Sequence, residues 1–224
     1  MLRATSPGRR RGAFCWPCVT LSVPFKRPAR RGGWQRGLVW SGWLRVGDHQ
    51  RIELNLHLLF ALTLVGLTWL LAQTFLPRLF PGWAPATYWL VAMAVAVMDA
   101  LAALLHELGH AGVAMARGRR VSRITLYGVA AAVRRSSGPT ASADQVLIAI
   151  AGPLSHLLVA TALWVAWSVL PDDNEPLRVA TGFPALANFV AGIFNLLPVA
   201  PLDGARVARA LATFCPRIGA STAG

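Results

Sequence analysis

The sequence predicts an all-α membrane protein with about four transmembrane helices, one of them discontinuous, and a short re-entrant β-hairpin. Two observations predict this class. The 224 residues are 55% hydrophobic, with a mean hydropathy of +0.49, which is too apolar for an ordinary soluble domain. The charged residues are only 14% of the chain and gather in short clusters between long uncharged stretches. That distribution is typical of loops that connect membrane spans.

The 22 Lys and Arg residues assign a side of the membrane to each loop. Eleven lie before Ile52, six lie between Arg117 and Arg135, and three follow Gly204. Despite a net charge of +13, separate basic clusters favour membrane loops over a nucleic-acid surface, so we expect no nucleic-acid partner. Because cytoplasmic loops carry an excess of Lys and Arg, we expect a multi-pass protein of the cell membrane with a cytoplasmic N-terminus.

We expect three parts along the chain. Residues 1–43 are rich in Arg, Gly, Pro and Trp, which predicts a basic, disordered cytoplasmic segment. The membrane-embedded core occupies residues 44–211, and a short tail covers residues 212–224. The four spans of the core are predicted at residues 54–77, 87–116, 143–170 and 177–211. The first contains 24 residues without a charge, which is enough to cross a bilayer with some tilt.

The loop between the second and third spans has the pattern of strands. From Val121 to Val129 apolar and polar residues partly alternate, and β-forming residues are frequent. We predict a short β-hairpin that dips toward the bilayer. Non-helical backbone at that depth is tolerated only where it lies against protein or water.

The second span contains the sequence His106-Glu107-Leu108-Gly109-His110. On a helix, residues four apart share one face, so both imidazoles can bind one Zn²⁺ at about 2.0–2.1 Å. Glu107 can then act as general base toward a water on the metal. The alternative is a chance pentapeptide with packed histidines. Ionisable groups in apolar spans are costly and usually functional, which favours the metal site.

A third ligand is predicted where the fourth span is interrupted. Pro198 and Pro201 lie three residues apart, so a regular helix cannot continue through them. Broken intramembrane helices mark binding sites, because the freed backbone must line something polar. Asp203 lies at this break and is the natural third zinc ligand.

Three other polar residues in the spans keep two interpretations each. Asp99 shares a helix face with His106 and His110, so it either orients a ligand or binds substrate, or it serves helix pairing. His57 is either an interfacial histidine or part of the site, and His156 is either a packed residue or a functional one.

Two motifs together resemble the site-2 protease family of intramembrane zinc metalloproteases. They are His106–His110 and Asn195-Leu196-Leu197-Pro198-Val199-Ala200-Pro201-Leu202-Asp203-Gly204. The resemblance implies His106, His110 and Asp203 as zinc ligands and Glu107 as the base. It also implies cleavage within or near the transmembrane helix of a single-span protein substrate in the bilayer, as part of regulated intramembrane proteolysis. The arginines after the second span predict that the active-site side is cytoplasmic.

A substrate helix must unwind before its peptide bonds can react, and its freed backbone then needs partners. We expect Ile124, Leu126 and Gly128 to provide them by strand pairing. Asn195 is expected to hold the scissile region or the oxyanion.

Other classes remain alternatives. One is a non-catalytic zinc-binding membrane protein of the same fold, and another is a truncated, inactive form. A prenyl-peptide protease would need a Glu as third ligand, and no Glu occurs between Glu107 and Glu175.

Overall fold

The computed structural model describes residues 19–22, 39–46, 50–127, 131–135 and 141–213. The strands are β1 (Val19–Ser22), β2 (Val39–Val46), β3 (Gln50–His57), β4 (Val121–Leu126) and β5 (Ala131–Arg135). The helices are α1 (Leu58–Leu70), the π-helical η1 (Leu71–Phe75), α2 (Leu76–Leu79), α3 (Pro85–Ala116), α4 (Ser142–Ser168), α5 (Glu175–Asn195) and α6 (Asp203–Ala212).

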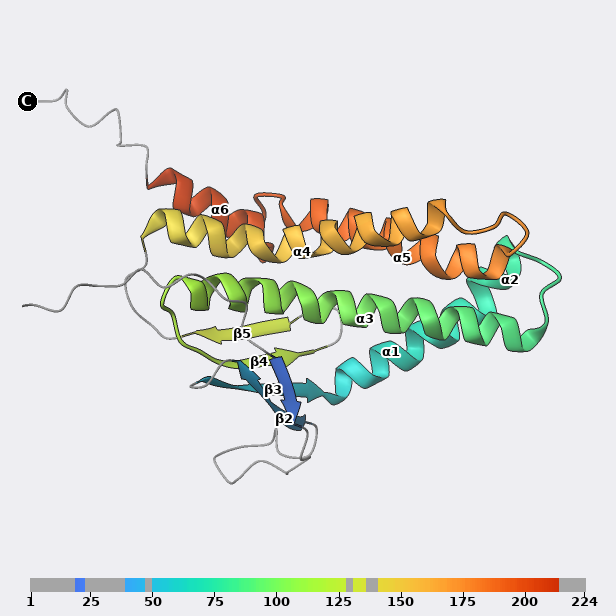
Figure 1. The fold of residues 1–224 in the computed structure, drawn as a ribbon, viewed down its shortest axis with the longest axis horizontal. Coiled ribbons are helices and arrows are strands. Elements are labelled where there is room, and N and C mark those ends of the chain that lie inside the picture. The colour runs from blue at the N-terminus through green and yellow to red at the C-terminus, as the bar shows by residue number, and fades with distance from the viewer. Residues whose placement is uncertain (1–18, 23–38, 47–49, 128–130, 136–140, 214–224) are drawn as a thin grey trace, which may run out of the picture.

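Helix α3 is the central element. The sheet and α1 lie on one side of it, and α4, α5 and α6 lie on the other (Figure 1). Four helical segments are long and apolar enough to cross a membrane: Leu58–Leu79, Pro85–Ala116, Ser142–Ser168 and Glu175–Asn195. Large apolar side chains are exposed along them, including Val65, Leu90, Leu158 and Val190. Such surfaces fit lipid rather than water, so the predicted multi-pass membrane fold is confirmed.

The first span begins later than predicted, because β3 continues through His57. Apolar and polar residues alternate from Ile52 to His57, which is the period-two pattern of a strand rather than the start of a helix. Helix α1 starts at Leu58, and His57 caps it by accepting a hydrogen bond at Nδ1 from the Leu59 N–H, at 3.2 Å. The predicted start at residue 54 is therefore four residues too early, and His57 serves as a cap.

The sheet is larger than the predicted hairpin. Its five strands follow the order β1-β2-β3-β4-β5, with β3 and β4 parallel and the other pairs antiparallel. β1 and most of β2 lie within residues 1–43, a segment expected to be disordered. Val and Trp in β2 have a high strand propensity, and pairing along the whole of β3 supplies its backbone partners.

One face of the sheet packs against α3. Leu54 lies opposite Ile124, and Leu56 lies opposite Leu126. Ile124 and Leu126 belong to a buried apolar cluster with Ile52, Ala111, Ala114, Val121 and Ile148. Leu54 and Leu56 are partly buried and pack against this cluster. This cluster ties the sheet to the last turns of α3, beside the two motif histidines.

The fourth span is discontinuous, as predicted. Helix α5 ends at Asn195, and α6 begins at Asp203. The intervening chain folds back tightly, since a Cβ atom on Gly204 would lie 2.1 Å from the carbonyl oxygen of Leu196. Only glycine allows this approach, which brings the start of α6 next to the middle of the bundle.

Candidate metal centre

Three predicted ligands converge at one buried point. The Nε2 atoms of His106 and His110 lie 3.1 Å apart. The Oδ2 atom of Asp203 lies 3.1 Å from His106 Nε2 and 2.9 Å from His110 Nε2. All three residues are buried. Two helix turns of α3 and the first residue of α6 therefore supply three ligand atoms to a single place.

The donor set fits zinc. Ligands at about 2.0–2.1 Å in tetrahedral geometry lie about 3.3 Å from one another. The observed separations of 2.9–3.1 Å approach that spacing. Two neutral imidazoles and one carboxylate are also a chemically suitable set, and they leave the fourth tetrahedral position open. Catalytic zinc sites have this arrangement, whereas structural sites use four protein ligands.

Helix α4 holds the ring of His110. Nδ1 of His110 donates a hydrogen bond to the carbonyl oxygen of Ile148, at 2.6 Å. A carbonyl can only accept, so the hydrogen is on Nδ1 and the lone pair of Nε2 faces the cluster. Such a contact fixes both the tautomer and the orientation of a metal-binding histidine.

The closest approach of α4 is at Gly152. A Cβ atom there would lie 2.3 Å from Nε2 of His110 and 2.7 Å from Nε2 of His106. Both distances are far below any real contact, so a side chain at this position would occupy the space of the ligands. Gly152, which precedes Pro153 in α4, therefore borders the metal centre directly.

Arg206 holds the other oxygen of the third ligand. Its guanidinium donates to Oδ1 of Asp203 at 2.8 Å, while Oδ2 faces the histidines. The side chain of Arg206 is 48% exposed and that of Asp203 only 8%. Arg206 is not among the site residues predicted from the sequence, although its position three residues after Asp203 on a helix is a usable signal.

Glu107 is also buried in the centre of the bundle. It lies close enough to His106, His110 and Asp203 to interact with them electrostatically. A carboxylate beside these ligands can accept and return a proton.

The expected substrate-binding strand has a different position. β4 is paired with β3 on one side and with β5 on the other. Ile124 and Leu126 are buried in the core between the sheet and α3. β4 therefore has no free edge at these residues, and the expected pairing with a substrate does not fit this strand. Gly128 lies outside the described residues.

Asn195 is at the last position of α5. Its Nδ2 donates to the carbonyl oxygen of Ala191 at 3.0 Å. An amide nitrogen has two N–H groups, and this bond uses one of them.

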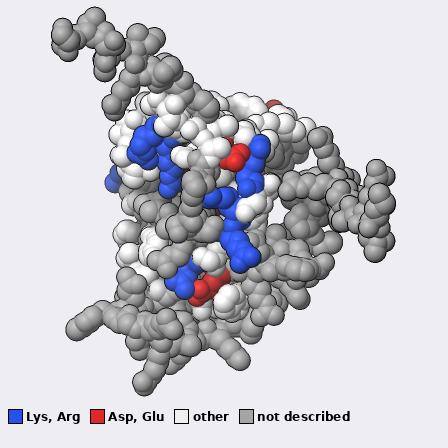
Figure 2. Space-filling view, turned by 90° about the vertical axis from the view of Figure 1, so that its left-hand side faces the viewer, with Lys and Arg blue, Asp and Glu red and all other residues white. Residues whose placement is uncertain are grey.

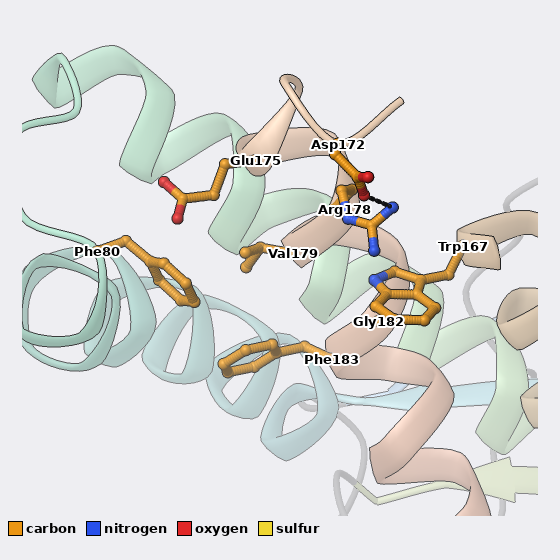
Figure 3. Close-up of a pocket in the computed structure, with 8 residues that line it drawn as sticks. All are labelled: Phe80, Trp167, Asp172, Glu175, Arg178, Val179, Gly182 and Phe183. Carbon is orange, nitrogen blue, oxygen red and sulfur yellow. Dashed lines mark ion pairs between the residues drawn. The ribbon is translucent and has the colours of Figure 1, made fainter. Parts of the chain in front are cut away.

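A cavity lies at the end of the bundle that is farther from the metal centre. It has a volume of about 360 Å³ and is lined by the aromatic rings of Phe80, Trp167 and Phe183, as Figure 3 shows. Arg178 pairs with Asp172 at 3.0 Å and stacks on Trp167, 4.3 Å from the ring centre. Arg178 therefore has partners within the protein, and Glu175 accepts a hydrogen bond from Nε1 of Trp83 at 2.9 Å. None of the predicted ligands lines this cavity.

Comparison with known proteins identifies the family. The family described as Peptidase M50B-like matches residues 79–200, more than half of the chain and including both histidines. The chain belongs to this family. The match confirms the resemblance to the site-2 proteases that the two motifs indicated.

Individual relatives of this M50B-like chain agree with the assignment. The candidate zinc metalloprotease Rip3 of Mycobacterium tuberculosis is 37% identical over 161 residues, which are 70% of this chain and 40% of the relative. A zinc metalloprotease of Methanocaldococcus jannaschii is 33% identical over 113 residues, 48% of this chain and 31% of that protein. The chain thus spans about two-fifths or less of these relatives.

A solved structure has the same fold. The site-2 protease from Methanocaldococcus jannaschii superposes with a TM-score of 0.53 at 24% identity, covering 78% of this chain and 72% of that one. At this identity the likeness concerns the fold alone.

Proposed function

We propose that this chain is an intramembrane zinc metalloprotease that hydrolyses a peptide bond within or near the transmembrane helix of a single-span membrane protein. The observation that carries the proposal is the buried triangle of His106, His110 and Asp203 with Glu107 beside it. The names of its relatives, which are zinc metalloproteases, support the same activity.

His106, His110 and Asp203 would hold the zinc. When bound, zinc polarises a carbonyl and makes water a nucleophile near neutral pH. Glu107 takes the proton of the attacking water at its carboxylate and then delivers it to the leaving amide nitrogen. Arg206 keeps Oδ2 of Asp203 directed at the histidines by holding Oδ1.

A non-catalytic zinc site is less consistent with these residues. A structural site needs four protein ligands and no base. Among the described residues, the cluster contains three ligands, and Glu107 is buried next to them at a considerable desolvation cost. Such a cost is typical of a functional group.

The edge strand β5 is the element that we propose to receive the substrate. It pairs with β4 on one side and, among the described strands, with none on the other. It also runs beside α3 (Figure 1). An unwound substrate segment can add to this edge and satisfy its backbone hydrogen bonds there. We therefore propose that β5, and not β4, forms the backbone hydrogen bonds with the substrate.

Asn195 remains a proposed contact for the scissile region or the oxyanion. Its second N–H is the relevant donor, since Ala191 accepts the first. A preorganised donor of this kind typically contributes about 2.7–4 kcal/mol to transition-state stabilisation.

We further propose that the metal centre faces the cytoplasm. Basic side chains spread over the end of the molecule next to the sheet and α6, as Figure 2 shows. Exposed residues there are Arg117, Arg120, Arg206 and Arg209, whereas the turn at the other end exposes Asp172, Asp173 and Glu175. An excess of Arg marks the cytoplasmic side of a membrane protein.

The decisive test uses Glu107→Gln, which keeps the size of the side chain and removes its basicity. We expect unchanged zinc content and a drop in cleavage of about 10²–10⁴-fold, the usual contribution of a general base. Membrane proteins of cells that express each form are compared by mass spectrometry for fragments that end inside a transmembrane sequence. Asp144→Asn, a change at the membrane surface, is the matched control and should cleave normally.

Two results would refute the proposal. Equal fragment yields from the wild type and Glu107→Gln would exclude the proposed base. A wild-type chain that binds zinc but produces no fragments would leave the non-catalytic alternative.

A further inference from the structure

Next to the metal centre lies a row of polar side chains to which the proposed reaction assigns no role. His156 of α4 is buried, and its ring centre lies 4.8 Å from that of His106. Nδ1 of His156 lies 2.7 Å from Oδ1 of Asn188 on α5. Nδ2 of Asn188 lies 3.1 Å from Oδ1 of Asp99 on α3. The row thus begins at a metal ligand and ends at a carboxylate inside the membrane span.

The direction of each hydrogen bond follows from the chemistry of the groups. Asn188 directs Nδ2 at two acceptors, the carboxylate of Asp99 and the carbonyl oxygen of Pro184, at 3.1 and 2.8 Å. An amide nitrogen can only donate, so the amide oxygen faces His156. That oxygen can only accept, so the ring hydrogen of His156 is on Nδ1. Nε2 of His156 therefore carries a lone pair.

A buried donor next to His156 lacks an acceptor. Nδ1 of His106 has no hydrogen-bond partner within the part of the chain that the structure describes. When Nε2 of this residue binds a metal, Nδ1 carries the hydrogen and needs an acceptor. An N–H···N bond between two imidazoles, with an N···N distance near 2.9 Å, places the ring centres about 5 Å apart. The observed ring centres lie 4.8 Å apart, close to that separation, with the rings tilted by 47°. No hydrogen bond joins the two nitrogens in this structure, so forming one requires a turn of one ring.

We propose that His156, Asn188 and Asp99 form a positioning relay for the metal ligand His106. In the metal-bound protein, Nδ1–H of His106 donates to Nε2 of His156. The latter donates from Nδ1 to Asn188, and Asn188 donates to Asp99. Every hydrogen bond points toward the carboxylate, so the relay increases electron density on His106 and fixes its ring. The relay rests on the proposed zinc site and adds residues of α4 and α5 to it.

The relay explains why two polar side chains, His156 and Asn188, are buried and a third, Asp99, is partly buried where apolar packing would be less costly. Asn188 is only 2% exposed and His156 only 8%. Intramembrane polar residues of this kind are expensive unless they have a function. In other metal sites, the groups that hold a ligand histidine affect metal affinity or activity by 10–100-fold.

The test measures zinc affinity of the full-length chain in detergent by competition with a chelator. His156→Phe keeps a flat ring but has no acceptor, and Asn188→Leu interrupts the relay one step further on. We expect each to weaken zinc binding by about 10–100-fold. His156→Gln, which retains an acceptor and a donor, should recover most of the affinity. Ser155→Ala is the matched control on the same helix, since the Ser155 hydroxyl donates to the Ala151 carbonyl of its own helix, at 2.9 Å.

A second measurement separates positioning from a purely structural role. The visible absorption of the Co²⁺-substituted chain reports the ligand field at the metal. It should change in His156→Phe and Asn188→Leu and remain as in the wild type in Ser155→Ala. A loss of helical stability alone would not change this spectrum.

Three results are informative against the relay. Wild-type affinity and spectrum in His156→Phe would overturn it. Weak binding in His156→Phe with normal binding in Asn188→Leu would overturn the part beyond His156. If His156→Phe and Asn188→Leu lose cleavage but keep the zinc affinity and the Co²⁺ spectrum of the wild type, the relay is also overturned and the protease proposal stands. A chain that binds zinc, shows the expected affinity differences and cleaves nothing would instead refute the protease proposal alone.

Discussion

Gly152 controls how closely α4 approaches the two histidines of α3. Its missing side chain leaves room for their Nε2 atoms, which would lie 2.3 and 2.7 Å from a Cβ atom. The atoms in the way belong to rings that are held by Ile148 on one side and by the cluster on the other. The rings cannot move aside without losing the geometry of the ligands.

Gly152→Ala should therefore weaken zinc binding by about 5–100-fold, because overpacking a tight interior usually costs about 1–3 kcal/mol. Gly112→Ala is the matched control. Gly112 lies on α3, two residues after His110, and a Cβ atom there would have no atom within 4 Å. Chelator competition on both variants measures the difference. Equal zinc affinity in the two would show that α4 does not pack on the ligands in this way.

The sequence contains the ligands but not their surroundings. His106 and His110 follow from helical spacing, and Asp203 follows from the two prolines that break the fourth span. The contacts of Gly152 and Ile148 depend on how α4 packs against α3, and those residues are about 40 positions away from the histidines. No local pattern encodes such an approach. Arg206 differs, because its spacing from Asp203 was visible in the sequence.

Among the elements, β3 shows why the first span starts later than the absence of charge predicts. Leu54 to His57 contains no charged residue and was assigned to the first span, although apolar and polar residues alternate from Ile52 onward. Absence of charge is common to a spanning helix and to a buried strand. Only the period distinguishes them, and the strand is confirmed by its pairing with β4.

The position of β4 changes how substrate pairing should be tested. A proline at Leu126 would break pairing with both neighbours and damage the core, so its effect on cleavage would be uninformative. β5 is the suitable strand, because only one side is used by β4. Along a strand, successive N–H groups point alternately to the two sides.

Proline lacks a backbone N–H, so Ala132→Pro and Val133→Pro remove hydrogen-bond donors that point to opposite sides of β5. One of these sides faces β4, and the other is the proposed substrate edge. The one whose N–H points away from β4 should reduce cleavage strongly and leave zinc content and thermal stability close to the wild type. Its neighbour should lower stability as well, because a bond between β4 and β5 is lost. Parallel assays of fragments, zinc and unfolding temperature make the comparison. Normal cleavage by both variants would refute pairing at this edge.

At the scale of the whole molecule, the length of α3 places the metal centre relative to the two membrane surfaces. Its 32 residues extend about 48 Å at 1.5 Å per residue, more than the roughly 30 Å of a bilayer core. The helix ends at Ala116, six residues after His110 and ten after His106, so the two histidines lie about 9 and 15 Å from that end. Water must reach the metal centre from the nearer side, which is the basic end in Figure 2.

The proposed orientation in the membrane predicts which end of the protein reacts with reagents outside the cell. We expect Arg120 of the basic end to be cytoplasmic and Asp173 of the acidic turn to be external, because Lys and Arg near the spans are retained inside. Arg120→Cys and Asp173→Cys are introduced separately into a chain in which the native cysteines are replaced by Ser. These are Cys15, Cys18 and Cys215.

An impermeant maleimide applied to intact cells should label the Asp173→Cys chain fully. It should label the Arg120→Cys chain only after lysis. Both positions are exposed, so failure to react in intact cells reports the membrane barrier rather than burial. The reverse labelling pattern would place the end of α3 that is nearer the metal centre on the external side, and proteolysis would then release the external part of a substrate. Labelling thus decides which fragment of a cut protein is set free.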